Sequence, residues 1–284
     1  MKIALCGTGL MGAPMAQEWQ ILGNQVSVWN RTLSKAEPLA TYGIKVSQTP
    51  SEALVEAQVL VLMLSDYSAS QAVVQTFSSG ELRNKTILQM GTLAPEQNLA
   101  LQEFIRSEGG HFLEAPVLGS IAQVKAHELI CMVGGEESLC LEFLPILEQL
   151  CKSVKWIGPV GSASSLKLAL NQMIPSLLAV FGLSLEFVRA SGVPVSTFME
   201  ILEQSALNAP TFAKKLPRYL SQDYTHPNFP VRHMLKDLAL FESASAGMDL
   251  NTGSLMSVKA LLNQAAEAGF ADQDYSALLT SIKN

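Results

Sequence analysis

The 284-residue chain is 48% hydrophobic and only 15% charged, with a formal net charge of −6. This length is enough to bury a substantial core, and we expect two domains of ordinary size. The negative charge and the absence of any run of Lys or Arg argue against a nucleic-acid or anionic-membrane surface, because both require a concentrated positive field. We therefore expect the partner to be a small molecule.

The cysteines and the apolar segments indicate a reduced, cytoplasmic protein. No CxxC pair is formed by the four cysteines, Cys6, Cys131, Cys140 and Cys151. The first residues loosely resemble a signal peptide, but glycines interrupt their apolar stretch, so export is not expected. The longest apolar stretch, Met173 to Leu185, is too short to cross a bilayer and contains Pro175. No membrane span is expected.

Short β-rich runs alternate with helix-length segments from residue 2 to about residue 157, the pattern of a parallel sheet covered by helices. Several runs are apolar without alternation, as expected when both faces of a sheet are buried. The strand candidates are Ile3–Cys6, Gln25–Trp29, Val59–Leu64, Thr86–Met90, His111–Glu114 and Leu129–Val133. Pro95–Ser107 and Glu136–Leu150 have apolar positions every three to four residues and are predicted helices.

Strand signals stop after the turn from Gly158 to Gly161, and Ala163 to Ala190 is predicted to form one long, mostly apolar helix. The remainder, with turns near Pro210 and Pro227, is again predicted to be helical. We therefore expect an α/β fold class: a Rossmann dinucleotide-binding domain over residues 1–160, followed by an all-α domain over residues 161–284 that is built on the long helix.

The segment Gly7-Thr8-Gly9-Leu10-Met11-Gly12 directly follows the first predicted strand and opens a helix, the context in which GxGxxG indicates dinucleotide binding. In such a loop the first glycine permits the tight turn, the second lets the backbone approach a pyrophosphate, and the third lets helix and strand pack closely. The helix N-terminus then faces the anion. An ordinary glycine-rich turn is the alternative.

The residues after the second predicted strand favour NADP(H) over NAD(H). NAD-specific sites usually place a carboxylate there for the ribose hydroxyls, whereas this chain has Asn30, Arg31 and Thr32. A guanidinium can pair bidentately with a 2′-phosphate while a hydroxyl and an amide donate further bonds. The alternative is that Arg31 is a solvated loop charge.

Two further strand ends are expected to complete the cofactor cleft, because ligands of such sheets bind outside the carboxyl ends of the strands. They are Leu64-Ser65-Asp66 and Met90-Gly91-Thr92. Ser65 and Thr92 are also residue types that helix N-caps favour, so a capping role is an equal alternative for both.

Lys167 lies in the first turns of the long helix, with Asn171 four residues later and therefore on the same face. A lone Lys in an apolar helix normally extends its amine to solvent. The residues alone leave this structural role open beside a catalytic one.

The chain resembles the β-hydroxyacid dehydrogenases, which include 3-hydroxyisobutyrate dehydrogenase and the glyoxylate/succinic semialdehyde reductases, almost from end to end. The segments that carry the resemblance are Gly7 to Ala16, Trp29 to Thr32, Glu114 to Ser120, Gly158 to Gly161 with Lys167 and Asn171, and Lys236-Asp237-Leu238 with Phe229. The resemblance identifies Glu114 to Ser120 as the substrate-binding segment and Lys236 as a cofactor-site residue.

The resemblance also implies a mechanism and a substrate pocket. Hydride passes from a nicotinamide to a carbonyl carbon while the Lys167 ammonium protonates the developing alkoxide, and Asn171 holds the amine and polarises the substrate. A lysine with its reference pKa of roughly 10.4 is a donor at neutral pH, which favours reduction. The implied substrate contacts are Thr92, Leu118, Gly119, Ser120, Lys167, Asn171, Phe229 and Asp237. The expected substrate is a small aldehyde or oxo acid such as succinic semialdehyde or glyoxylate, or in reverse a 3-hydroxy acid.

Three positions depart from the family pattern. Leu118 replaces the usual Ser, whose hydroxyl helps to bind a substrate carboxylate, and Val124 and His127 stand where small residues are common. These changes bear on the substrate and not on the reaction class. No second His or Cys lies at metal-ligand spacing from His127, so a structural role is expected for it and no metal is expected.

Two alternatives stay open. An imine reductase on the same fold is one, although such enzymes typically replace the catalytic Lys that this chain retains; a non-catalytic NADP-binding module is the other. The predicted long helix is too apolar to be covered by its own domain alone, so we expect a homodimer or homotetramer.

Overall fold

The computed structural model describes residues 1–282, and its contacts divide the chain into two compact units, Met1–Lys167 and the part from Leu168 onwards. The division lies seven residues after the predicted boundary at residue 160. The long helix α7 (Ser162–Ala190) begins in the first unit and supplies the first helix of the second.

The first unit is built on a nine-stranded sheet with the order β3-β2-β1-β4-β5-β6-β8-β7, in which β9 pairs with β8. Strands β1 to β6 pair in parallel, β8 runs antiparallel to β6 and β7, and β9 runs parallel to β8. The strands are β1 (Lys2–Cys6), β2 (Gln25–Trp29), β3 (Lys45–Val46), β4 (Val59–Leu62), β5 (Thr86–Gln89), β6 (His111–Glu114), β7 (Val117–Leu118), β8 (Leu129–Gly134) and β9 (Cys151–Gly158). The order 3-2-1-4-5-6 of the parallel part is that of a dinucleotide-binding sheet.

Helices cover both faces of this sheet, as the uniformly apolar strands predict. On β1, Ile3 and Leu5 face a core that includes Trp19, while Ala4 and Cys6 face a second core. The helices are α1 (Gly12–Ile21), α2 (Pro50–Leu54), α3 (Tyr67–Val74), α4 (Pro95–Ser107), α5 (Ile121–Lys125) and α6 (Glu137–Glu148), with 3₁₀ turns η1 (Leu33–Lys35) and η2 (Glu37–Tyr42). Helices α1 and α6 contribute to the first core, and α2, α3 and α4 to the second.

Three strands were not predicted from the sequence. Strands β3 and β7 have only two residues each, too few for a pattern. Strand β9 pairs only with β8 and is half-exposed, and its Lys152 and Lys155 interrupt any apolar run. All six predicted strands are present, with their ends shifted by two residues at most.

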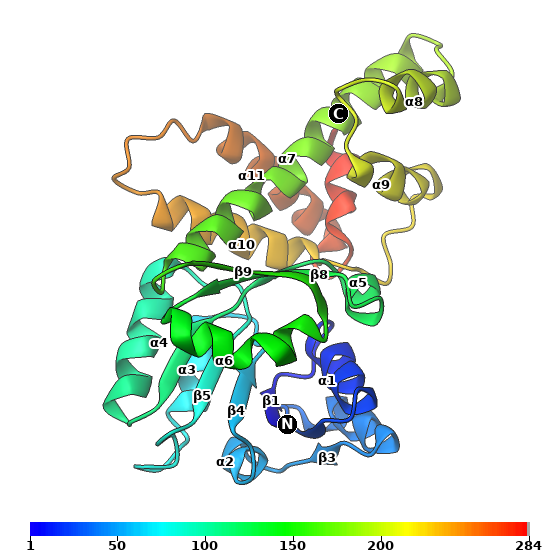
Figure 1. Ribbon diagram of the computed structural model, residues 1–284. Helices are drawn as coiled ribbons and strands as arrows, with labels where there is room; N and C mark the ends of the chain where they lie inside the picture. Colours follow the sequence, from blue (N-terminus) through cyan, green and yellow to red (C-terminus); the bar gives the residue numbers. More distant parts are fainter. Residues whose placement is uncertain (283–284) are drawn as a thin grey trace. The chain divides into compact units, whose positions relative to one another are not determined.

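The second unit is helical, coloured from green to red in Figure 1. Beside α7 it contains α8 (Val195–Glu203), α9 (Pro210–Ser221), α10 (Val231–Ala244), α11 (Gly253–Ala265), and the helical turns η3 (Ala266–Phe270) and η4 (Tyr275–Ile282). Its core joins Leu178, Phe181 and Leu185 of α7 to residues of α9, α10, α11 and η4. The predicted fold class, a Rossmann domain followed by an all-α domain, is confirmed.

The expectation that no segment is long enough to cross a bilayer needs correction. Pro175 lies inside α7 without ending it, so the helix reaches 29 residues and is long and apolar enough to span a membrane by length and composition. Only 44% of its most apolar window is buried. The core helix of a soluble protein meets the same criterion, so this property alone does not indicate a membrane. It does leave apolar surface exposed.

Candidate active site

The glycine loop between β1 and α1 has the shape that phosphate binding requires. Gly7 has a φ of +106°, and a Cβ there would lie 2.3 Å from the carbonyl oxygen of Met63. A Cβ on Gly12 would lie 1.9 Å from the carbonyl oxygen of Gly7, whereas a Cβ on Gly9 would meet nothing within 4 Å. Gly7 and Gly12 are therefore required by the fold, and Gly9 borders open space. The loop fits a pyrophosphate at that point.

The helix end beside this loop has no side-chain cap. The N-cap residue of α1 is Met11, whose side chain makes no capping hydrogen bond, while the amide of Ala13 donates to the carbonyl oxygen of Gly9 (3.2 Å). An anion at this end would meet the positive end of the helix dipole. Leu10 is exposed and Met11 is half-buried. Both predicted cofactor residues thus lie at the helix N-terminus that faces the expected pyrophosphate.

The carboxyl ends of β1, β4 and β5 meet closely. Gly7 packs against Met63 and the side chain of Leu64, and a Cβ on Gly91 would lie 2.7 Å from the carbonyl oxygen of Leu64. Strands β1 and β4 are neighbours although β2 and β3 lie between them in sequence. This is the switch point at which doubly wound sheets bind ligands.

Neither Ser65 nor Thr92 is a helix N-cap. Asp66 caps α3 by accepting from the amide of Ala69 (2.8 Å), and the Ser65 hydroxyl donates to Asp66 Oδ2 (2.7 Å). The N-cap of α4 is Ala94, two residues after Thr92. A capping role is therefore excluded for both residues. Ser65 stays a proposed cofactor contact, and Thr92 a proposed contact of the cofactor and the substrate.

Asn30 has a structural task that the sequence did not reveal. Its Oδ1 accepts from the amide of Thr8 (3.1 Å) and its Nδ2 donates to the carbonyl oxygen of Thr32 (2.8 Å). Asn30 thereby joins the glycine loop to the loop after β2. The exposed side chains of Arg31 and Thr32 are the groups of this loop that remain open to a phosphate.

Glu114, at the end of β6, anchors the first turn of α7. Its fully buried carboxylate accepts from the amides of Gly161 and Ala163 through Oε1 (2.8 Å each) and from Asn98 Nδ2 through Oε2 (2.9 Å). Burial raises the pKa of Glu114, although the hydrogen bonds from Ser164, Ala163 and Gly161 act in the opposite direction. Sequence reasoning gave Glu114 no role of its own; a carboxylate at the end of a buried strand was the available signal.

Lys167 does not extend to solvent. Its side chain lies within the first unit, where Nζ donates to the carbonyl oxygen of Val117 (2.8 Å), and the residue is only 8% exposed. Val117 is three residues after Glu114, so one short segment holds both the start of α7 and the amine one turn further along it. This contact contradicts the solvent-directed alternative for Lys167.

The predicted substrate segment continues through β7 into α5. Leu118 is half-buried and pairs with Ile130. Gly119 has a φ of +136°, and a Cβ there would lie 2.5 Å from the Leu129 side chain. The amide and the hydroxyl of Ser120 both donate to Gln123 Oε1 (3.0 and 2.7 Å). The Ser120 hydroxyl proton is thus engaged at the start of α5.

The second unit contains the remaining predicted site residues. Asn171 is 1% exposed, and its Nδ2 donates to Asp237 Oδ2 (2.6 Å). Asp237 Oδ1 pairs with Lys236 Nζ (2.9 Å). Within residues 1–282, Asn171 Oδ1 has no hydrogen-bond partner. Asn171 therefore offers a buried acceptor whose orientation Asp237 fixes.

His127 has the structural role expected of it. Its Nε2 lies 3.0 Å from Glu18 Oε2, and the pair joins the end of α5 to α1. The described residues contain no group of three side chains that could hold a metal ion.

Comparisons with known proteins match this arrangement along the whole chain. A family profile described as the NAD binding domain of 6-phosphogluconate dehydrogenase matches residues 2–158, and one described as NAD-binding of NADP-dependent 3-hydroxyisobutyrate dehydrogenase matches residues 161–282. Glyoxylate/succinic semialdehyde reductase 1 of Arabidopsis thaliana is 33% identical over 292 residues, covering 100% of this chain and 99% of the relative. The chain belongs to the β-hydroxyacid dehydrogenase family. It is an oxidoreductase that binds a nicotinamide dinucleotide.

Solved structures share the fold. 3-Hydroxyisobutyrate dehydrogenase of Mycobacterium tuberculosis, solved with L-serine, has a TM-score of 0.87 at 22% identity and covers 99% of both chains. An imine reductase from Myxococcus stipitatus in complex with NADP⁺ has a TM-score of 0.68 at 22% identity and covers 100% of both chains. At these identities the likeness establishes the fold alone.

Gly9→Ala tests the phosphate site. Because the φ of Gly9 is not positive and its surroundings are open, the thermal unfolding midpoint should not fall. A methyl group there would occupy the approach of the pyrophosphate, so the dissociation constant of NADPH, measured by fluorescence titration, should rise on the order of tenfold. Gly12→Ala is the contrast and should lose stability as well. Unchanged NADPH affinity in folded Gly9→Ala would contradict this site.

Glu114→Gln tests the anchor of α7 through pH. Because the pKa of folded Glu114 lies above its ordinary value of 4.5, the folded state binds this proton more tightly than the unfolded state. The free energy of unfolding of the wild type should therefore rise relative to that of Glu114→Gln as the pH falls from neutral towards 4.5.

Urea unfolding at several pH values measures this difference. Asn98 can rotate its amide so that its unpartnered Oδ1 accepts from the new Gln, which keeps the variant folded. The exposed Glu96→Gln is the control and should show a smaller pH effect. A difference that shrinks as the pH falls would show that the amide bonds outweigh burial at Glu114.

Proposed function

We propose that this protein is an NADPH-preferring reductase of a small aldehyde or oxo acid, with Lys167 as the proton donor. The observation that carries the proposal is the amine of Lys167, which is withdrawn from solvent and held by Val117 O in the predicted substrate segment. A buried amine fixed beside a dinucleotide-binding sheet suits proton transfer to a carbonyl oxygen.

The proposed reaction divides between the cofactor and the chain. A bound nicotinamide supplies the hydride that reduces the carbonyl carbon. The Lys167 ammonium donates one proton to the developing alkoxide, while the bond from Nζ to Val117 O limits the directions in which the amine can point. Oxidation of the alcohol requires the same amine in its neutral form.

Asn171 would orient the other side of the reacting oxygen. It lies one turn after Lys167 on α7, and its amide nitrogen is committed to Asp237. Its Oδ1 is then available to accept from the product hydroxyl. Lys236, paired with Asp237, is the proposed cofactor contact of the second unit.

The preference for NADPH rests on Arg31 and Thr32. Both side chains are exposed beside the glycine loop, and residues 30–32 include no carboxylate that would repel a 2′-phosphate. Asn30 contributes by holding the two loops together.

The substrate pocket should favour an uncharged aldehyde over one that carries a carboxylate. Leu118 presents an isobutyl group where the family usually has a hydroxyl, and the Ser120 hydroxyl already donates to Gln123. The Gly119 amide is then the remaining candidate of this segment for a carboxylate. We propose a short aldehyde or oxo acid of the succinic semialdehyde or glyoxylate type, with modest activity on the acids. The retained Lys167 disfavours imine reduction.

The function is tested by following NADPH and NADH oxidation with short aldehydes, with and without a terminal carboxylate, and with a cyclic imine. The proposal expects aldehyde reduction with a kcat/KM for NADPH at least about tenfold above that for NADH, since a charge-assisted contact is worth on the order of 1.5–3 kcal/mol. Turnover of the imine alone, or equal use of both cofactors, would contradict it.

Lys167→Ala should lower kcat by about 100-fold or more while NADPH affinity changes little, because the variant removes a general acid and no cofactor contact. Steady-state kinetics and a fluorescence titration measure the two effects. Lys152→Ala, an exposed lysine of β9, is the control and should behave as the wild type. If Lys167→Ala kept most of the wild-type turnover, Lys167 would have a structural role and not a catalytic one.

Leu118→Ser should raise kcat/KM for succinic semialdehyde relative to an uncharged aldehyde of similar length. A restored hydroxyl donor is worth about 1–3 kcal/mol to a carboxylate that otherwise meets apolar surface, a factor of roughly 5–150. Leu118→Ala enlarges the pocket without adding a donor, so it should not reproduce this change. An unchanged ratio in Leu118→Ser would show that residue 118 does not set specificity.

We also propose that a second copy of the chain covers the exposed face of α7. Val180, Leu183 and Phe187 are 68%, 63% and 72% exposed, an unusual surface for large apolar side chains of one helix. Light scattering at micromolar concentration should therefore give the mass of a dimer or tetramer. Phe187→Asp should lower that mass, and a monomeric wild type would contradict the proposal.

A further inference from the structure

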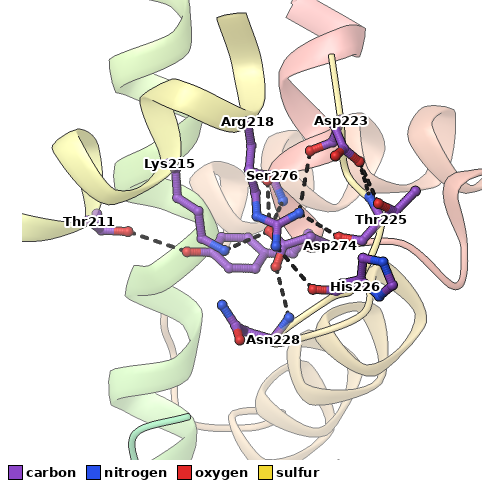
Figure 2. Close-up of polar contacts among 10 residues, drawn as sticks. Thr211, Lys215, Arg218, Asp223, Thr225, His226, Asn228, Asp274 and Ser276 are labelled. Atoms are coloured by element: carbon purple, nitrogen blue, oxygen red, sulfur yellow. Dashed lines mark hydrogen bonds and ion pairs between the residues drawn. The ribbon is translucent and has the colours of Figure 1, made fainter. Parts of the chain in front are cut away.

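A buried ion pair lies in the second unit, outside the residues assigned above. Lys215 Nζ on α9 lies 2.6 Å from Asp274 Oδ1, just before η4 (Figure 2), and the side chains are 4% and 0% exposed. Desolvation lowers the pKa of Lys215. Burial alone would raise the pKa of Asp274, but the attraction of Lys215 and the bonds from Ser276 outweigh it and lower that pKa.

Asp274 holds more than one segment of the unit. Its Oδ1 also accepts from the amide and the hydroxyl of Ser276 (3.1 and 2.7 Å), and its Oδ2 accepts from the amide of Asn228 (3.2 Å). Lys215 Nζ lies 4.4 Å from the centre of the Tyr275 ring. The pair therefore connects α9, the start of η4 and the segment before α10.

A second cation of α9 binds the same segment directly. Arg218 donates to the carbonyl oxygens of Asp223, Thr225 and His226 (3.3, 2.6 and 3.0 Å; Figure 2). The linker from residue 222 to residue 230 has no helix or strand of its own. Its conformation thus depends on α9: Arg218 fixes its first half and, through Asp274, Lys215 fixes its second half.

Phe229, for which the family resemblance implies a substrate contact, lies near the end of this linker. The carbonyl oxygen of Phe229 accepts from the amide of Tyr275 (2.9 Å), and the two rings meet edge to face with centroids 6.3 Å apart. Val231, the first residue of α10, donates to Gln273 O (2.9 Å). Phe229 and the start of α10 are therefore hydrogen-bonded to Tyr275 and Gln273, the residues on either side of Asp274.

Stability alone is a weak reason for such a pair. Two charges withdrawn from water lose their hydration, and apolar side chains of similar volume often stabilise a protein equally well or better. A charged pair differs from an apolar one in fixing direction: Asp274 can satisfy its oxygens only while Asn228, Ser276 and Lys215 keep their places.

We propose that the Lys215–Asp274 pair is a positioning device that sets Phe229 against the substrate. The inference rests on the proposed function and on the substrate contact that the family resemblance implies for Phe229. Lys215 and Asp274 are positioning residues: they act through the linker and through Tyr275. Loosening them should misplace Phe229 and weaken substrate binding more than it affects the cofactor.

The test compares Lys215→Met, Asp274→Asn and the double variant, which keeps the cavity filled and leaves no unpaired charge. Lys214→Met, an exposed neighbour on α9, is the matched control. The proposal expects KM for the aldehyde to rise by about tenfold or more in each pair variant, with NADPH affinity unchanged and Lys214→Met like the wild type. A folded double variant with an unchanged KM overturns the proposal, even if the single variants do not fold.

Phe229→Ala separates positioning from general loosening. If the pair acts through Phe229, adding the double variant to Phe229→Ala should raise KM no further, whereas independent effects would multiply and overturn the proposal. Hydrogen exchange of residues 222–231 should accelerate in the pair variants and not in Lys214→Met. A wild type that reduces no aldehyde would refute the proposed function itself. An active enzyme whose KM does not change in the pair variants would refute only the positioning role.

Discussion

The buried carboxylate of Glu114 is the constraint on which the rest of the site depends. It satisfies the amides of Gly161 and Ala163, which α7 would otherwise leave unpaired at its start, and it is itself held by Asn98. A carboxylate enters an apolar interior only when such donors surround it. The contact therefore fixes where α7 begins relative to β6.

The position of the Lys167 amine depends on this start of α7. One turn beyond Ala163, its amine reaches Val117 O, so the segment from Glu114 to Val117 holds α7 at two points. A further turn brings Asn171, whose amide Asp237 fixes from α10. The phosphate loop of β1 and the amine of α7 belong to the same unit, and Asn171, Phe229 and Lys236 to the other. Helix α7 thus carries both the proposed proton donor and, four residues later in the sequence, Asn171.

The sequence predicted the parts of the fold that repeat a pattern. The six apolar strands could be predicted because both faces of the sheet are buried. The glycine loop could be predicted because Gly7 and Gly12 have no sterically allowed substitute. The long helix could be predicted from its length and its mostly apolar residues. The edge strand β9 was missed since Lys152 and Lys155 face solvent, whereas α7 begins one residue before its predicted start at Ala163 and ends at its predicted end, with Pro175 inside it.

The site was predictable as a set of residue types and not as a set of contacts. Lys167 and Asn171 were identified by spacing and resemblance, but the sequence could not show that Val117 O holds the amine or that Asn30 is engaged by the loops. Such partners lie far apart in the chain and carry no pattern. The Lys215–Asp274 pair, 59 residues apart, is of the same kind and was not predicted.

In the proposed reaction the ammonium of Lys167 provides the proton for reduction. The most direct measurement is the pH dependence of aldehyde reduction at saturating NADPH, compared between the wild type and folded Lys167→Ala. The wild-type rate should fall at alkaline pH, as the amine loses its proton, and the slow variant should show no such fall. The same alkaline fall in both enzymes would contradict proton donation by Lys167.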